Sequence, residues 1–448
     1  MSMSITLKPL DEQVLVITGA TSGIGLTTAR IAARRGASVV LAARSAGALK
    51  QLAEEIVREG GQAIAVVADV SLEEDVRAIA EQALATYGRI DSWVNNAGVG
   101  LYGRTEDVST ADMRRLFETN FWGVVYGSRE ALKHLKLGGG AIINLGSEVS
   151  ERSVPLQGMY CASKHAIKGF TEALRMELED EGAPVSVTLI KPGQIDTPFT
   201  INARNYLDSE PHHVPPVYAP DAVARAILHS AEKPVRDVFV GGGGRLVAAL
   251  GHLAPGLTDR LIEATVIPGT PSGRMPRRDR DKSVLDVPSE ALSERGNYDG
   301  FVQKISLYTE ARLHPVLTGA VLATVGFLVS SVFGGSSHRP ARTIGRKGRS
   351  PAKALHIRLE ARKGREAEVE ELVLEILGHV QQEPGTRPWY ATRLSRRVFE
   401  IFETFPNESG RRAHLSGEGA ALLMKRSNDL LVRPAVITRL DVLAASEA

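Results

Sequence analysis

Cysteine is almost absent from this chain of 448 residues, since Cys161 is the only one. A single cysteine excludes a framework of disulfides within the chain, and it fits a reducing compartment. The first residues, MSMSITLKPLDEQ, also lack the apolar core of a secretory signal peptide. We therefore expect a protein of the cytoplasm.

An excess of one charge sign is missing as well. The chain has 54 Lys and Arg against 52 Asp and Glu, a net charge of +2, which gives no argument for a nucleic-acid partner. Hydrophobic residues make up 43% and charged residues 24%, the balance of a folded protein. The length exceeds that of one ordinary domain and suggests two or three domains, and no internal repeat is visible.

Short apolar runs alternate with helical patterns over about the first 245 residues. The expected strands cover residues 14–18, 38–43, 63–68, 92–96, 141–145, 185–190 and 237–241. Continuous apolar strands that alternate with helices are typical of a parallel sheet covered on both faces. The pattern predicts an α/β fold with a Rossmann-type doubly wound parallel sheet.

A glycine-rich turn, TGATSGIG at residues 18–25, joins the first expected strand to the first helix. Glycines allow a tight turn and let backbone N–H groups approach a pyrophosphate, and the helix N-terminus favours anionic oxygens. Glycine also simply ends strands, but its place between a strand and a helix indicates a dinucleotide site.

The end of the second expected strand bears on the choice of cofactor. Ala43 stands where an acidic residue would bind the ribose hydroxyls, and Arg44 follows it. An arginine can pair with a 2′-phosphate, so we favour NADP (NADPH) over NAD, unless Arg44 is only an exposed loop residue. Asp69 is a candidate contact to the adenine edge, or else a cap for a helix that begins near Ser71.

Three polar residues satisfy the demands of carbonyl–alcohol chemistry. Hydride transfer to a carbonyl needs an acid to protonate the oxygen and a donor to polarise it. Tyr160 and Lys164 are four residues apart, which puts them on one helix face, where the ammonium should lower the pKa of the phenol. Ser147 follows an expected strand and can donate a hydrogen bond to the substrate oxygen.

With these motifs in order, residues 10–245 resemble the short-chain dehydrogenase/reductase family. The matching segments are TGATSGIG, Asp69-Val70, NNAG at 95–98, ETNFWG around Asn120, NLGS ending at Ser147, YCASK at 160–164 and PGQIDT at 192–197. The resemblance implies that Tyr160 is the general acid/base, that Lys164 supports it and holds the nicotinamide ribose, that Ser147 positions the substrate oxygen, and that Asn120 anchors a water.

The resemblance also implies a set of cofactor contacts in the same part of the chain. These residues are Gly19, Thr21, Ser22, Gly23, Ile24, Gly25, Arg44, Asp69, Val70, Asn96, Ala97, Gly98, Tyr160, Lys164, Pro192, Gly193 and Thr197. Asn96 and Gly98 have an alternative role in stabilising the central strand.

The substrate is a small carbonyl or alcohol whose identity the sequence leaves open. Residues 198–220 are rich in proline and could close over it. His212 and His213 lie in this segment, and adjacent histidines without acidic or cysteine neighbours are usually polar loop residues, so we expect no metal. A lipophilic substrate fits the apolar segment described next.

An uncharged run of 18 residues, Val316 to Phe333, follows a linker and helical extension at 266–313. Its length is at the short end for a membrane helix, and its Thr, Ser and Gly residues leave a buried helix as the alternative. We expect an apolar, membrane-associated helix at 314–335 and then a basic linker at 336–353. The first domain then covers 1–265.

Residues 354–448 show a β-α-β-β-α-β pattern, which predicts a ferredoxin-like α+β domain. This region resembles the antibiotic-biosynthesis-monooxygenase type of domain through EPGTRPWYATRL at 383–394 and FEIFETFPNESGRRAHLSG at 399–417. Trp389, Asn407 and His414 could line a cavity, or act as a core tryptophan, a helix cap and a surface histidine.

Three functions remain open at this stage. The first is a homo-oligomeric NADP(H)-dependent oxidoreductase whose C-terminal domain supports dimerisation or ligand handling. The second is a bifunctional enzyme whose C-terminal domain is a cofactor-free monooxygenase. The third is a membrane-linked dinucleotide-binding scaffold, which the complete set of Ser147, Asn120, Tyr160 and Lys164 argues against.

Overall fold

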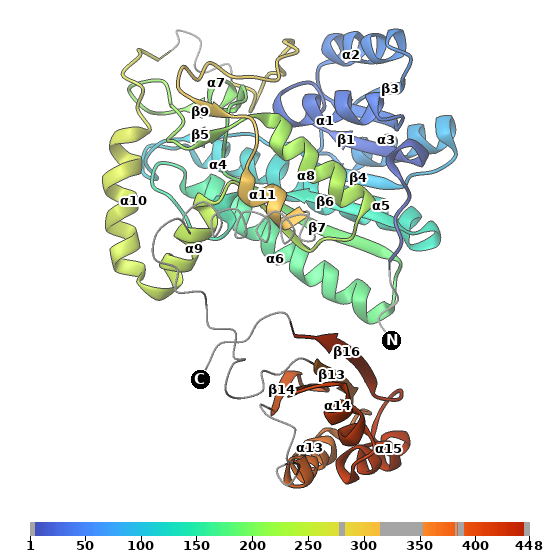
Figure 1. Cartoon of the computed structure of the whole chain (residues 1–448). Coiled ribbons are helices and arrows are strands. Elements are labelled where there is room, and N and C mark those ends of the chain that lie inside the picture. Colours follow the sequence, from blue (N-terminus) through green and yellow to red (C-terminus); the bar gives the residue numbers. More distant parts are fainter. Residues whose placement is uncertain (1–4, 277–282, 314–352, 381–382, 384–388, 443–448) are drawn as a thin grey trace, which may run out of the picture. The chain divides into compact units, whose positions relative to one another are not determined.

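The chain forms two compact units in a computed structural model (Figure 1), which describes residues 5–276, 283–313, 353–380, 383 and 389–442. The first unit holds a parallel sheet of seven strands in the order β11-β7-β6-β4-β1-β2-β3. The strands are β1 (Val14–Thr18), β2 (Ser38–Ala43), β3 (Gln62–Val67), β4 (Ser92–Asn95), β6 (Gly140–Leu145), β7 (Val185–Pro192) and β11 (Asp237–Val240). The predicted doubly wound parallel sheet is therefore confirmed.

Two apolar cores lie on the two faces of this sheet because alternate strand residues point in opposite directions. Leu15 and Ile17 pack on one face with α1 (Gly23–Arg34), α2 (Ala46–Arg58) and α8 (Pro220–Glu232). Val14 and Val16 pack on the other face with α3 (Glu73–Tyr87), α5 (Gly123–Gly138) and α6 (Gly158–Glu181). The fully apolar strands of the sequence are explained by burial on both sides.

β2 and β3 lie on one side of β1, and β4 lies on its other side. The strand order therefore reverses between β1 and β4. In open parallel sheets ligands bind at the carboxyl ends of the strands at such a switch point. Most of the smaller elements of the first unit lie in the connections that follow the strands, whereas the first of them precedes β1. They are η1 (Leu10–Glu12), β5 (Leu101–Tyr102), α4 (Thr110–Phe117), η2 (Glu118–Trp122), η3 (Glu148–Ser150), β8 (Gln194–Ile195), α7 (Phe199–Asn202), β9 (Arg204–Asn205), β10 (Val217–Tyr218), α9 (Gly243–Leu253), α10 (Pro255–Gly269), β12 (Val302–Gln303) and α11 (Leu307–Leu313).

Residues 283–296, which we call the strap, differ from the linker that composition predicts. Ser22 and Ser293 form a parallel bridge, and the carbonyl of Ser293 accepts a hydrogen bond of 2.9 Å from Gly23 N. Arg295 lies 2.6 Å from the buried carboxylate of Asp196. The strap thus packs on the glycine-rich turn, and its Arg295 forms an ion pair with a residue elsewhere in the first unit.

The second unit contains an antiparallel sheet of four strands in the order β14-β15-β13-β16. Its elements are β13 (Lys353–Glu360), α13 (Glu366–Val380), β14 (Trp389–Ser395), β15 (Val398–Phe405), α14 (Glu408–Leu415), α15 (Glu418–Leu430) and β16 (Val436–Asp441). Its core unites buried strand residues such as Leu355 and Ile401 with Leu372 and Leu423 from the helices. The second helix of the predicted β-α-β-β-α-β pattern is divided into α14 and α15 at Gly417, which precedes α15.

No helix among the described residues has the length and apolar character needed to cross a membrane. The apolar segment expected at 314–335 and the basic linker expected at 336–353 fall outside the described residues, apart from Lys353 at the start of β13.

Candidate active site

Two adjoining cavities open at the carboxyl ends of the central strands. The first is lined by the glycine-rich turn, the ends of β2 and β4 and part of the strap. The second is lined by the ends of β6 and β7 and by the start of α6. Both cavities share Ile24, Asn96, Gly98, Thr197 and Phe199, so they form one continuous site.

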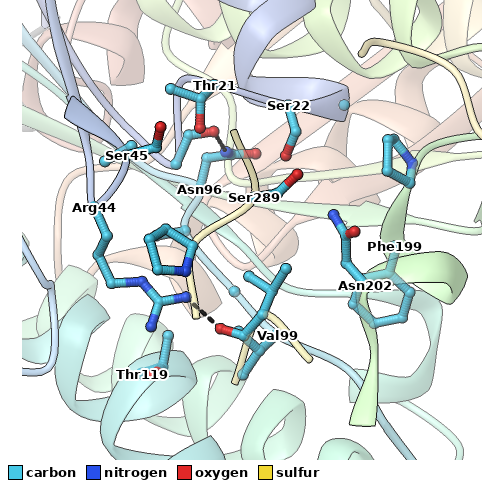
Figure 2. Close-up of a pocket in the computed structure, with 18 of the residues that line it drawn as sticks. Thr21, Ser22, Arg44, Ser45, Asn96, Val99, Thr119, Phe199, Asn202 and Ser289 are labelled. Carbon is cyan, nitrogen blue, oxygen red and sulfur yellow. Dashed lines mark hydrogen bonds between the residues drawn. The ribbon is translucent and has the colours of Figure 1, made fainter. Parts of the chain in front are cut away.

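The first cavity contains most of the residues predicted to contact the cofactor. Figure 2 shows Thr21 and Ser22 on one side, Arg44 on a second, and Phe199 and Asn202 opposite Arg44. The predicted residues that line it are Gly19, Thr21, Ser22, Gly23, Ile24, Arg44, Asp69, Val70, Asn96, Ala97, Gly98 and Thr197. Pro192 and Gly193 line the second cavity, whereas Gly25 lines neither.

The glycine-rich turn depends on close backbone approach. Gly19 has a φ of 66°, and a Cβ built there would lie 2.9 Å from the Cα of Ala97. A Cβ on Gly25 would lie 2.1 Å from the carbonyl oxygen of Gly19. Asn96 closes the turn, because its amide nitrogen donates to the carbonyls of Thr18 (2.9 Å) and Gly19 (3.2 Å). The turn and the N-terminus of α1 therefore form a cradle suited to the pyrophosphate of a dinucleotide.

Arg44 lines the first cavity but already has partners. Its guanidinium donates to the carbonyl oxygens of Val284 and Leu285 in the strap, and it lies 4.0 Å from the carboxylate of Asp69. Burial lowers the pKa of Arg44, while Asp69 acts in the opposite direction. Arg44 is thus not a free loop residue, and a 2′-phosphate would have to share it with the strap.

Asp69 holds the turn before α3 but does not cap that helix, whose N-cap is Leu72, and its contact to an adenine edge stays a prediction. Its carboxylate accepts hydrogen bonds from the backbone N–H (3.0 Å) and hydroxyl (2.7 Å) of Ser71, and it pairs with Arg115 at 2.5 Å. Burial would raise the pKa of Asp69, but the bonds from Ser71 and Arg115 outweigh it and hold the pKa low. The residue fixes the local turn and still lines the cavity.

The second cavity brings Ser147, Tyr160 and Lys164 together. Ser147 follows β6 and Tyr160 begins the long helix α6, so two different elements supply the hydroxyl pair. The Ser147 hydroxyl donates to the carbonyl of Pro192 at 3.5 Å and is close enough to the Tyr160 phenol to favour the ionised form of that phenol. Lys164 lies one turn along α6, with its Nζ 5.7 Å from the centre of the Tyr160 ring and 2.8 Å from the carbonyl of Leu145.

The acidity of Tyr160 differs from the expectation. Burial raises the pKa of the phenol, and the hydrogen bond from Ser147 only partly opposes this. Burial also lowers the pKa of Lys164 to about 8. In the polypeptide by itself desolvation disfavours both charged forms, so the pKa of Tyr160 is raised on balance, and the expected lowering by the ammonium stays a prediction.

Asn120 lies beside the two cavities without lining either of them. It sits in η2, a π-helical turn, and is fully buried. Its side chain exchanges two hydrogen bonds with the backbone of Val99, at 2.8 and 3.0 Å, and a third reaches Ser163 at 3.3 Å. The contacts described fix the loop that follows β4, and the expected water remains a prediction.

Several residues that line the two cavities were not predicted from the sequence. In the first cavity they are Ser45, Val99, Thr119, Pro198, Phe199, Asn202, Val284, Pro288 and Ser289, and in the second Tyr102, Gln157, Gln194 and His213. Chain order gives no signal for the strap, which returns to the site from about 240 residues away in sequence. His213 is the main correction here, because it is a buried residue of the cavity wall rather than a polar loop residue.

Metal ligands do not gather at either cavity. Within the described part of the chain, no three side chains of His, Cys, Asp or Glu are grouped closely enough to hold an ion.

In the second unit, a small cavity is lined by apolar residues together with Trp389, Glu403 and His414. His414 contacts Glu383 at 2.6 Å and Glu403 at 3.0 Å. Asn407 caps α14 by accepting a hydrogen bond of 2.9 Å from Gly410 N. The structure thus supports the cavity reading for Trp389 and His414 and the cap reading for Asn407.

Comparison with known proteins agrees with this architecture. The family described as short chain dehydrogenase matches residues 13–207. A Bacillus subtilis protein named "Uncharacterized oxidoreductase YxnA" is 49% identical over 322 residues, which cover 71% of this chain and 90% of that protein. A Sesamum indicum protein named "11-beta-hydroxysteroid dehydrogenase A" is 38% identical over 237 residues, covering 50% of this chain and 67% of the relative.

The parallel sheet and the site at its switch point define a dinucleotide-dependent oxidoreductase. The chain belongs to the short-chain dehydrogenase family, and it acts on CH–OH groups with a nicotinamide dinucleotide.

Proposed function

We propose that this protein interconverts a carbonyl and a secondary alcohol with NADP(H), using Tyr160 as the general acid/base. The observation that carries the proposal is that Ser147, Tyr160 and Lys164 line one cavity, which is continuous with the dinucleotide cradle. The bound nicotinamide supplies or accepts the hydride. Every other demand of the reaction falls on the side chains of this cavity.

In the direction of reduction, a carbonyl oxygen lies between the hydroxyls of Ser147 and Tyr160. Ser147 donates a hydrogen bond that polarises the carbonyl, and Tyr160 donates the proton that the oxygen takes up. The high pKa of the buried phenol keeps Tyr160 protonated and ready to donate. In oxidation Tyr160 takes the proton back from the alcohol.

Lys164 supports this exchange from the next turn of α6. Its bond to the carbonyl of Leu145 fixes the amine beside the phenol ring. An ammonium in this position stabilises the phenolate that forms when Tyr160 gives up its proton. Asn120 acts further out, by holding the backbone of Val99 at the cavity edge, and we retain it as the anchor of a water in the proton path.

The preference for NADP(H) rests on Arg44. Its guanidinium faces the first cavity, and no acidic residue stands at Ala43 to repel a 2′-phosphate. The contacts of Arg44 with the strap hold the guanidinium at this wall.

Replacement of Tyr160 by Phe tests the mechanism. We expect Tyr160→Phe to lower ketone-dependent oxidation of NADPH by about 10²- to 10⁴-fold, because the proton donor is lost. Tyr102→Phe is the matched control, since Tyr102 lines the same cavity and should leave most of the rate intact. A Tyr160→Phe enzyme with the wild-type rate would overturn the mechanism.

For the second unit, we propose a ferredoxin-like fold that binds an apolar ligand with a hydroxyl group. The strand order β14-β15-β13-β16 and the β-α-β-β-α-β succession support the fold. The cavity supports the function, because the fully buried carboxylate of Glu403 faces apolar walls beside Trp389. A buried carboxylate in apolar surroundings favours a ligand that can donate a hydrogen bond.

A further inference from the structure

We infer that His213 is a substrate-recognition residue, which accepts a hydrogen bond from a second hydroxyl group on the substrate. The inference rests on the proposed function, since it places the reacting carbonyl at Ser147 and Tyr160. It adds a chemical class: substrates that carry a hydroxyl group away from the reacting carbon.

His213 belongs to the wall of the substrate cavity. It lines the second cavity together with Ser147 and Tyr160, and only 5% of its surface is exposed. The ring of Tyr298 meets the His213 ring edge-on, with centroids 6.0 Å apart. The imidazole is therefore held in place, and it is not a mobile side chain of the loop.

One ring nitrogen of His213 has a partner and the other does not. Nδ1 lies 3.0 Å from Oε1 of Gln194, whereas Nε2 is buried without a hydrogen-bond partner among the described residues. Because buried polar atoms are nearly always paired, an unpaired nitrogen in the wall of a cavity indicates a partner that enters the cavity.

Gln194 determines whether Nε2 donates or accepts. Its Oε1 lies 3.0 Å from Nδ1 of His213, and an amide oxygen can only accept a hydrogen bond. Nδ1 of His213 then carries the proton, and Nε2 offers a lone pair.

The charge state of His213 agrees with this role. Burial lowers the pKa of His213 to about 4, so the imidazole is neutral at ordinary pH and keeps one acceptor nitrogen.

The neighbouring residue provides a matched control. His212 faces the carboxylate of Asp299 at 3.5 Å and does not line the cavity. Phe replaces either histidine with a ring of similar size that cannot accept a hydrogen bond. His213→Phe and His212→Phe therefore separate recognition of a hydroxyl from general effects on this segment.

The test compares cyclohexanone with 2-, 3- and 4-hydroxycyclohexanone, using the full chain and NADPH absorbance. We expect the wild type to favour at least one hydroxyketone in kcat/KM by about tenfold, because its hydroxyl pairs with Nε2. His213→Phe should abolish this preference, while His212→Phe should keep it. Equal values for all four ketones in the wild type, or a preference that survives in His213→Phe, would overturn the inference.

Binding measurements keep this result separate from catalysis. Calorimetric titration of NADP-loaded Tyr160→Phe, in which oxidation of the alcohol is suppressed, with cyclohexanol and the cyclohexanediols should show tighter binding of one diol, and the further change His213→Phe should remove the difference. Loss of turnover in Tyr160→Phe with the diol preference retained would uphold both proposals. An unchanged rate in Tyr160→Phe would defeat the mechanism alone, and equal binding of all the alcohols would defeat the role of His213 alone.

Discussion

Arg44, on which the proposed preference for NADP(H) rests, also holds the strap in place. Its guanidinium lines the cavity and donates to two carbonyl groups of the strap. An aspartate there would repel a 2′-phosphate and accept the hydrogen bonds of ribose hydroxyls instead.

We therefore expect Arg44→Asp to raise the Kd for NADPH by at least tenfold and to change the Kd for NADH much less. Arg58→Asp is the control, because Arg58 is an exposed residue at the end of α2, away from the cavities. Titration of each variant with both cofactors, followed by their fluorescence, measures the two constants. Equal weakening of NADPH and NADH would exclude a contact between Arg44 and the 2′-phosphate.

At this same scale, the sequence predicts residues in motifs and misses residues that only folding brings together. Twelve of the predicted cofactor contacts line the first cavity, because a turn after a strand stays at the strand's end in any such fold. His213 and Ser289 were missed, since a histidine in an irregular loop and a serine in a polar segment carry no pattern. The acidity of Tyr160 was also missed, because burial cannot be read from spacing.

Among the elements, the turn between β1 and α1 imposes the strictest local demand. Gly19 combines a positive φ with a close approach to Ala97, whereas Gly60 has a φ of 88° and nothing within 4 Å of a built Cβ. Gly19→Ala thus adds a steric clash to backbone strain, while Gly60→Ala adds strain of about 1–2 kcal/mol alone.

We expect Gly19→Ala to lower the free energy of unfolding by more than Gly60→Ala does and to weaken NADPH binding. Urea unfolding of the two variants measures the first quantity, and fluorescence titration with NADPH measures the second. The same loss of stability in both variants, with unchanged NADPH binding in Gly19→Ala, would contradict the role assigned to the turn.

The order of strands and helices was predictable at the scale of elements, but the strap was not. Apolar strands that alternate with helices allow few topologies, and the observed sheet is one of them. The strap is rich in polar and charged residues, which is typical of a loop. Its position depends on pairs distant in sequence, such as Arg295 with Asp196, which no local pattern encodes.

On the scale of the whole molecule, the two compact units hold chemically different cavities. The residues proposed for hydride transfer all belong to the first unit, and the second unit has a cavity of its own that is lined by the buried Glu403 and His414. Burial would lower the pKa of His414, but Glu403 and Glu383 outweigh it and raise the pKa. The two carboxylates thus favour the charged form of the imidazole, and the second oxygen of Glu403 can accept from a hydroxyl group.

We expect 1-naphthol to quench tryptophan fluorescence of the full chain in a saturable way, and Trp389→Phe to remove this quenching. The matched control is Trp122→Phe, because Trp122 lies in the first unit. Oxygen uptake with 1-naphthol would favour the bifunctional enzyme, whereas binding without uptake would favour ligand handling. Quenching that persists in Trp389→Phe would contradict a ligand site in this cavity.

The transfer of hydride to a ketone, with Tyr160 as proton donor, is most directly tested with NADPH in which both hydrogens at C4 are replaced by deuterium. With the wild type and a reducible ketone, we predict deuterium on the carbinol carbon of the product, with one alcohol formed for each NADPH oxidised. Tyr160→Phe should form this labelled alcohol about 10²- to 10⁴-fold more slowly. An unlabelled alcohol, or labelled alcohol formed at the same rate by Tyr160→Phe, would contradict the account.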